Sequence, residues 1–220
     1  MSQTDFPENE PETPMRRATR VAAVATLGVV SGWLSGKCYA YFGSRAGENE
    51  FGEWSPGFFY AVVWIAVLHG PFRGTSRDRL RRSVVWNLLL AAGIVASWAM
   101  AHRSAIWIAK ESSGPIPEEA AIYLAGFGGG AVGCLGLVNL WAIFFRAAEP
   151  WPARILLTVL GVGLGASLGA FWVPEAHAQN LDIPFRVVDF FTVWQGGMAA
   201  ALAIVDDAWR NREGVTASPR

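Results

Sequence analysis

Residues 120–145 read AAIYLAGFGGGAVGCLGLVNLWAIFF, a stretch without a single charged side chain. Its length suits the hydrocarbon core of a bilayer, which an α-helix crosses with about 20 apolar residues. A soluble helix of this length would present a polar face to water, and this stretch has none of useful width. It therefore predicts a transmembrane helix and sets the class of the whole chain.

Five further apolar stretches accompany it. Of the 220 residues, 52% are hydrophobic and only 16% are charged. We expect an all-α, polytopic membrane protein whose fold is a bundle of six transmembrane helices, arranged as three helical hairpins. The expected spans are residues 20–42, 54–72, 84–107, 120–145, 154–173 and 186–205. Residues 1–19, acidic and proline-rich at their start, are expected to form a disordered tail, and residues 206–220 a short second tail.

The basic residues define the orientation. If the N-terminus is cytoplasmic, 13 of the 18 Lys and Arg residues lie on the cytoplasmic side and five lie outside. The positive-inside rule then predicts both termini in the cytoplasm, most simply at a bacterial-type cytoplasmic (inner) membrane. The span 54–72 is the weakest, because Pro56 and Pro71 bracket a short apolar core that suits a re-entrant segment. The arginines of 73–82 favour a crossing, since otherwise they would lie outside.

The segment 73–82 (RGTSRDRLRR) is the most basic part of the chain. We expect it to lie on anionic lipid headgroups, to which each cation contributes about 1 kcal/mol. The alternative is that it acts as an orientation signal alone. The formal net charge of the chain is zero, which argues against a nucleic-acid partner. A second copy of the chain or another membrane protein remains open as a partner.

Short motifs recur between the hairpins and suggest a weak threefold repeat. Gly28 to Trp33 (GVVSGW) parallels Gly93 to Trp98 (GIVASW). An aromatic pair four residues apart recurs in the even-numbered spans, as Tyr60/Trp64, Tyr123/Phe127 and Phe190/Trp194. The alternative is chance, because membrane helices use a small set of residue types.

Glycines at four-residue spacing mark faces for helix packing. Lipid provides no hydrophobic drive between helices, so small residues allow their backbones to approach closely. The predicted packing positions are Gly28, Gly32 and Gly36; Gly126, Gly130 and Gly133; and Gly161, Gly165 and Gly169. Small residues surround most of the span 120–145, which we expect at the centre of the bundle. No Lys-Ser/Thr follows its glycines, so a phosphate-binding loop is excluded.

Tryptophans often lie at the membrane interface, and Trp86 and Trp141 are expected there on the cytoplasmic side. Trp64 and Trp194 lie near the middle of their spans instead. Two large rings at matched depth are suited either to line a cavity or to fill space opposite glycines.

Polar side chains within the spans are the candidate binding residues, because burying them in hydrocarbon is costly. Near the outer side, Asp189 and Gln195 are candidates for a polar wall, with Trp194 beside them. Asp189 has an alternative partner in Arg186, and a lone amide such as Gln195 often bridges helices. On the cytoplasmic half, His69, Asn87 and Asn139 lie at similar depth in three spans and form a second candidate site.

Enzyme motifs are missing from the sequence. A rhomboid-type protease needs Gly-x-Ser-Gly in one span and a histidine two spans later, and here the fourth span has no serine and the sixth no histidine. With three histidines in the chain, no pair is placed to hold a haem or di-iron centre, and we expect no cofactor and no metal. Glu118 and Glu119 with His102 match no defined metal spacing.

Two functions remain. The first is transport of a small solute or ion, either as a permease or as the membrane subunit of a transporter. Hairpin symmetry, glycine-rich helices and polar residues at two depths favour it. The alternative is a non-catalytic assembly or scaffold protein, in which the glycine faces mediate helix association.

Overall fold

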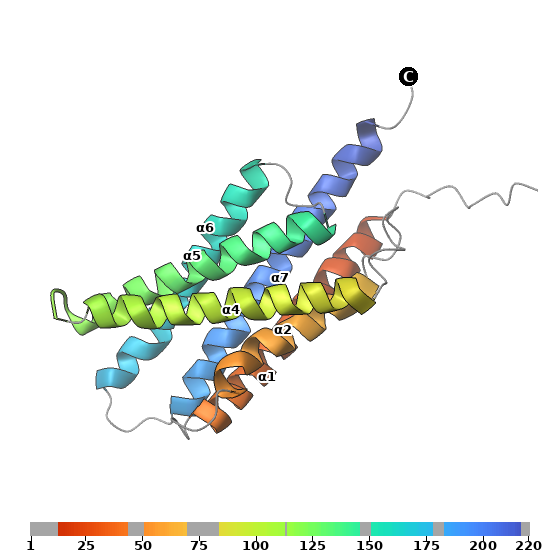
Figure 1. Cartoon of the computed structure of the whole chain (residues 1–220). Coiled ribbons are helices and arrows are strands. Elements are labelled where there is room, and N and C mark those ends of the chain that lie inside the picture. The colour runs from red at the N-terminus through yellow and green to blue at the C-terminus, as the bar shows by residue number, and fades with distance from the viewer. Residues whose placement is uncertain are drawn as a thin grey trace, which may run out of the picture.

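The computed structural model describes residues 13–43, 51–69, 84–112, 114–145, 151–177 and 183–216. Within these ranges the chain is all-helical (Figure 1). The helices are α1 (Pro14–Gly43), α2 (Phe51–His69), α4 (Val84–Ser112), α5 (Glu118–Phe145), α6 (Trp151–His177) and α7 (Ile183–Thr216). Each lies on one expected span, and the basic segment 73–82 lies outside the described residues.

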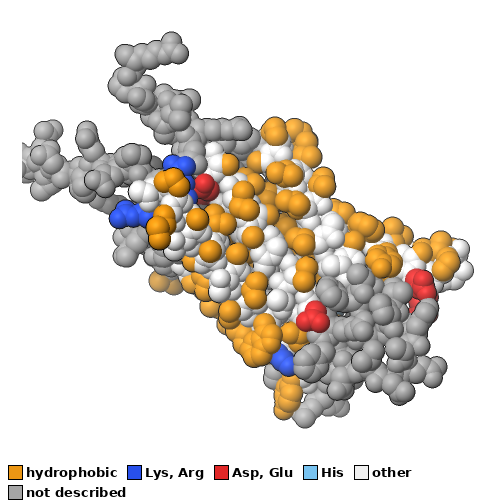
Figure 2. Space-filling view, turned by 180° about the vertical axis from the view of Figure 1, so that it is seen from behind, with side chains coloured by type: hydrophobic (Ala, Val, Ile, Leu, Met, Phe, Trp, Pro, Cys, Tyr) orange, Lys and Arg blue, Asp and Glu red, His pale blue; other side chains and the backbone are white. Residues whose placement is uncertain are grey.

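Four of the helices are long and apolar enough to cross a membrane. These segments are Pro14–Tyr41, Val84–Ser112, Glu118–Phe144 and Val188–Ala208. The two remaining helices contain shorter apolar segments, Trp54–Val67 and Trp151–Ser167. Figure 2 shows hydrophobic side chains along the helices on one face, with charged side chains gathered near the helix ends. This distribution is the one expected of a protein that meets lipid rather than water.

Prolines begin three of the helices. Pro14 starts α1, while Pro152 and Pro184 are the second residues of α6 and α7. Proline suits the first turn, because the N–H that it lacks would have no partner within the helix. Every helix extends past its expected span at one end or both, and two of them reach into the expected tails: residues 14–19 are helical, and α7 continues beyond residue 205 to Thr216.

The six helices form a ring. Each packs against its neighbours in the chain, and α7 closes the ring by packing along α1, the most extensive contact between any two helices. Figure 1 shows α1, α2 and α7 side by side, with α4 and α5 crossing in front of α6. The expectation of a central α5 is therefore wrong. It packs between α4 and α6, and its Leu124, Leu135 and Ile143 are exposed.

Glycines bring α1 against α7. A Cβ added to Gly28 would lie 2.7 Å from the carbonyl oxygen of Gln195, and one added to Gly32 would lie 2.5 Å from the Cα of Thr192. Gly36 lies equally close to the backbone of Val188. Only glycine permits this approach, so these three positions determine how closely α1 and α7 pack.

A second glycine contact joins α5 to α6. A Cβ on Gly130 would lie 2.6 Å from the carbonyl oxygen of Gly161 and 2.9 Å from the Cα of Gly165, and Gly165 also lies against the carbonyl of Gly126. On another face of α5, Gly133 packs against Ala101 of α4. The surroundings of Gly169 lie outside the description.

Aromatic residues fill one half of the ring. Trp64 and Trp141 are buried and meet edge to face, with ring centroids 4.4 Å apart. Tyr60 packs against both Trp64 and Trp194. Trp141 therefore packs inside the protein, because its face of α5 points across the ring toward Trp64.

The aromatic pairs of the suggested repeat have different surroundings. Tyr60 is 2% exposed in the core, whereas Tyr123 and Phe127 are 37% and 42% exposed. Equivalent positions in the hairpins thus do not share an environment, and the repeat gains no support.

Candidate functional site

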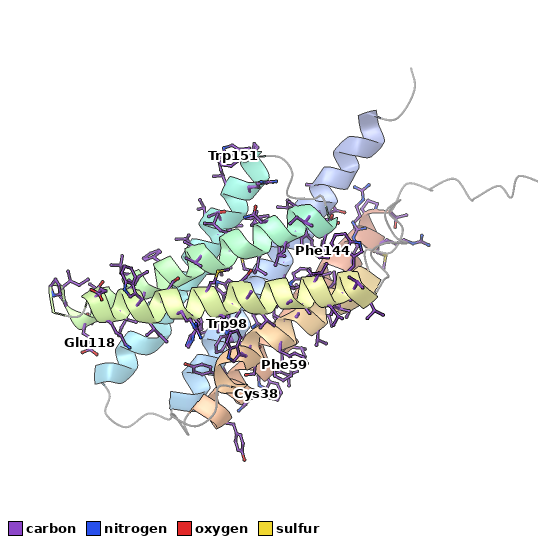
Figure 3. The ribbon with its side chains drawn as sticks, viewed as in Figure 1. Cys38, Phe59, Trp98, Glu118, Phe144 and Trp151 are labelled. Carbon is purple, nitrogen blue, oxygen red and sulfur yellow. The ribbon has the colours of Figure 1, made fainter. Side chains whose placement is uncertain are left out.

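A cavity of about 330 Å³ lies inside the ring, between α4, α5 and α7. It occupies the half of the molecule where α4 ends and α5 begins. Figure 3 places Trp98 near the middle of α4 and Glu118 at the start of α5, and both residues line the cavity. Tyr39 of α1 and Gly165 of α6 complete the wall.

Small side chains line this space, and some of them also bring the helices together, as where Gly129 meets Ala105. Ala101, Ala105 and Ala109 recur every four residues, so they lie on one face of α4, and all three line the cavity. The facing surface of α5 is equally small, with Ala125, Gly126, Gly129 and Gly130. The backbones of α4 and α5 are not among those that come closest to α7, and side chains such as Trp98 and Phe191 meet across the space instead. The volume between them is therefore left open.

The opposite wall is aromatic. Phe191 of α7 lies 5.0 Å from Trp98 and 5.6 Å from Tyr39, measured between ring centroids. The His102 ring is stacked on Trp98 at 6.1 Å and meets Tyr39 edge-on at 6.0 Å. The Tyr39 hydroxyl and His102 Nε2 are 3.4 Å apart, within hydrogen-bond distance. These contacts hold four rings from three helices in one connected wall.

The floor of the cavity is Trp194, which is 5% exposed. Beyond it, toward Gly57 and Ser97, a gap of only about 10 Å³ remains. Tyr60 then packs on Trp194 at a centroid distance of 6.0 Å, and the buried Trp64 follows. The cavity is thus partly open, and aromatic rings close it on the side of Trp194 and Tyr60.

Gln195, next to this floor, belongs to a buried hydrogen-bond network. Its side-chain oxygen accepts a hydrogen bond from Ser31 at 2.6 Å, and its amide donates to Ser35 at 3.0 Å and to the carbonyl of Pro56 at 3.3 Å. Gln195, Ser31 and Ser35 are all fully buried. The amide joins α1, α2 and α7, so its hydrogen-bonding groups are used within the protein.

The predicted outer residues Asp189, Trp194 and Gln195 have different surroundings. Trp194 faces the cavity, whereas Asp189 is exposed on α7 and does not line it. Gln195 touches only the small gap behind Trp194. The structure therefore does not join Asp189 and Gln195 into one polar wall.

The structure describes the side chains of two of the three predicted inner residues. Asn139 is exposed, and its amide donates to the carbonyl of Leu135 on its own helix at 2.8 Å. Asn87 is half-buried on α4, and the side chain of His69 lies outside the description. Within the described ranges, no group of three His, Cys, Asp or Glu residues is placed to hold a metal ion.

Sequence reasoning missed the main wall of this cavity. Trp98 and His102 lie four residues apart, next to the alanine face of α4, and this pattern was a usable signal. The contributions of Tyr39 and Phe191 carried no such signal, because only the packing of α1 and α7 brings them to α4.

No protein-family model, curated protein or solved structure matches this chain.

Proposed function

We propose that the chain is a six-span integral protein of a cytoplasmic membrane, with both termini inside, that transports a small solute. It acts either as a permease or as the membrane subunit of a transporter. The cavity between α4, α5 and α7 carries this proposal, because it is partly open and is closed on one side by Trp194 and Tyr60. Alternating-access transporters present such a half-open site in each of their end states.

The ring supports six crossings. The helices α2 and α6 have the shortest apolar segments, yet each packs between two of the longer helices. Their places in the ring favour full spans over re-entrant segments. With a cytoplasmic N-terminus, the ends of α4 and α5 that flank the cavity face outward, and the segment 73–82 lies inside against anionic headgroups.

The scaffold alternative relies on glycine faces that are available to partners. In the described residues these faces are largely occupied within the chain, since Gly32 contacts α7 and Gly130 contacts α6. Gly163 differs, because nothing lies within 4 Å of a Cβ added there. This distribution favours transport over assembly through glycine contacts.

The test is solute flux. Purified protein in proteoliposomes is screened with radiolabelled solutes, preselected by the thermal stabilisation that they give in detergent. Transport predicts saturable uptake that exceeds uptake by liposomes without protein. Stabilising ligands that are never taken up would instead indicate a binding or sensory role.

A further inference from the structure

We propose that the cavity binds a small lipophilic organic cation, such as a quaternary ammonium group carried by one aromatic ring. This deepens the proposed function by assigning a substrate class to the same site. Three observations carry it: the aromatic wall, the charge of the lining and the cavity's size.

The wall offers ring faces to a cation. Tyr39, Trp98 and Phe191 are in mutual contact, and Phe190 and Trp194 also line the cavity. An aromatic face attracts a cation through the negative potential above the ring, most strongly for tryptophan and where water is excluded. The same wall accommodates the apolar body of the ligand.

The charged groups in the lining favour a cationic ligand over an anionic one. Among the described lining residues, only Glu118 and His102 can carry a charge near neutral pH, and neither Lys nor Arg is present. Glu118 lines the cavity and is exposed at the start of α5, where its carboxylate attracts cations. Among the described lining residues, an anion would meet this carboxylate and no fixed cationic partner.

Nearby basic residues already bind aromatic rings outside the cavity. The Arg103 guanidinium lies 5.8 Å from the centre of the Trp54 ring, and the Lys37 ammonium lies 5.9 Å from that of Trp33. None of these four residues lines the cavity.

Size limits the ligand. About 330 Å³ lies at the lower end of the range of about 300–1,000 Å³ that is usual for small-molecule sites. Compounds with one ring and a compact charged group fit this volume better than large multi-ring dyes.

The test is equilibrium dialysis of the full chain in zwitterionic lipid nanodiscs, with empty nanodiscs subtracted. Three probes share a phenyl ring: benzyltrimethylammonium, its uncharged isostere neopentylbenzene, and the anion benzenesulfonate. We expect saturable binding of the cation that is at least about tenfold tighter than that of either other probe. Equal or tighter binding of the neutral or anionic probe, or no saturable binding of the cation, overturns the proposal.

Matched variants locate the site. Trp98→Leu is compared with Trp107→Leu, because Trp107 lies on the same helix and is 64% exposed. Glu118→Gln is compared with Glu119→Gln at the neighbouring position. Only the first of each pair should weaken cation binding, by about tenfold for Trp98 and a few-fold for Glu118. Equal effects within both pairs would overturn the assignment. Cation binding without flux would refute transport alone, whereas flux of other solutes without cation binding would refute only the ligand class.

Discussion

The hydroxyl of Ser31 donates a 2.6 Å hydrogen bond to the side-chain oxygen of Gln195, and both side chains are fully buried. This bond joins α1 to α7 across their tightest contact, and the Gln195 amide extends the network to Pro56 of α2. Polar groups buried in this way cost free energy whenever a partner is removed. Gln195 is therefore the point at which three helices depend on one side chain.

Replacing Gln195 tests this dependence. Gln195→Leu leaves Ser31 and Ser35 without the amide and should lower the free energy of unfolding by about 1–3 kcal/mol. Unfolding is followed by SDS titration in mixed micelles. Asn139→Leu is the control, because Asn139 is exposed and bonds only within its own helix, so it should change stability by less than about 0.5 kcal/mol. Equal losses in the two variants would contradict the bridging role.

Two glycine-to-alanine substitutions distinguish the effect of a helix contact on stability from the effect of helix propensity. Gly32→Ala places a methyl group against the backbone of Phe191 and Thr192 and should destabilise the protein by about 1–3 kcal/mol. Gly163→Ala enters open space and should be neutral or stabilising by up to about 1 kcal/mol, since alanine favours the helix. The same titration measures both variants, and a tolerated Gly32→Ala would show that α1 and α7 are not packed as described.

An ion pair between Arg20 and Asp207 joins α1 to α7 at a second point. The side chains are 9% and 21% exposed, and the charged atoms are 2.5 Å apart. This partial burial places the pair between exposed and buried cases, so a double-mutant cycle of Arg20→Ala and Asp207→Ala should give a coupling of about 1–2 kcal/mol. A coupling near zero would mean that the pair contributes nothing to the closure of the ring.

Filling the cavity should abolish ligand binding. Ala109→Phe places a ring into the cavity wall, whereas Ala96→Phe places the same ring on an exposed position of the same helix. The first variant should lose most of the thermal stabilisation by a bound solute, and the second should retain it. Retention by both variants would place the ligand elsewhere.

Cysteine labelling tests the proposed orientation. In a background with Cys38 and Cys134 replaced by serine, a cysteine at Glu119 should react with a membrane-impermeant maleimide in intact cells. A cysteine at Arg16 should react only after permeabilisation. The reverse pattern would invert the topology and place the cavity on the cytoplasmic side.

Hydropathy located the helices because a run of apolar residues is a local property of the chain. All six helices coincide with expected spans, although their ends differ by several residues, since a helix can continue past the apolar core where caps and partners allow it. The closing contact of α7 with α1 was not predictable from order along the chain, because it joins the two ends of the helical domain.

The sequence identified candidate residues from their own helix, but it did not identify the residues of other helices that surround them. Gln195 stood out as a polar residue in an apolar span, but its partners Ser31, Ser35 and Pro56 lie far away in sequence. Trp141 was assigned to the interface from its position alone, and Trp64 on another helix explains its burial. In both cases the environment of the side chain came from a helix that the pattern could not identify.

The sequence by itself determined an all-helical chain with apolar helices of membrane length and glycine faces, because these features depend on hydrophobicity and residue size at fixed spacing along one helix. The tertiary structure alone decided that the helices form a closed ring, that Gln195 is buried among serines, and that Tyr39, His102 and Phe191 surround a cavity. A cavity is the space that several helices leave between them. It depends on how far each helix is held from the others, and no single segment of sequence contains that distance.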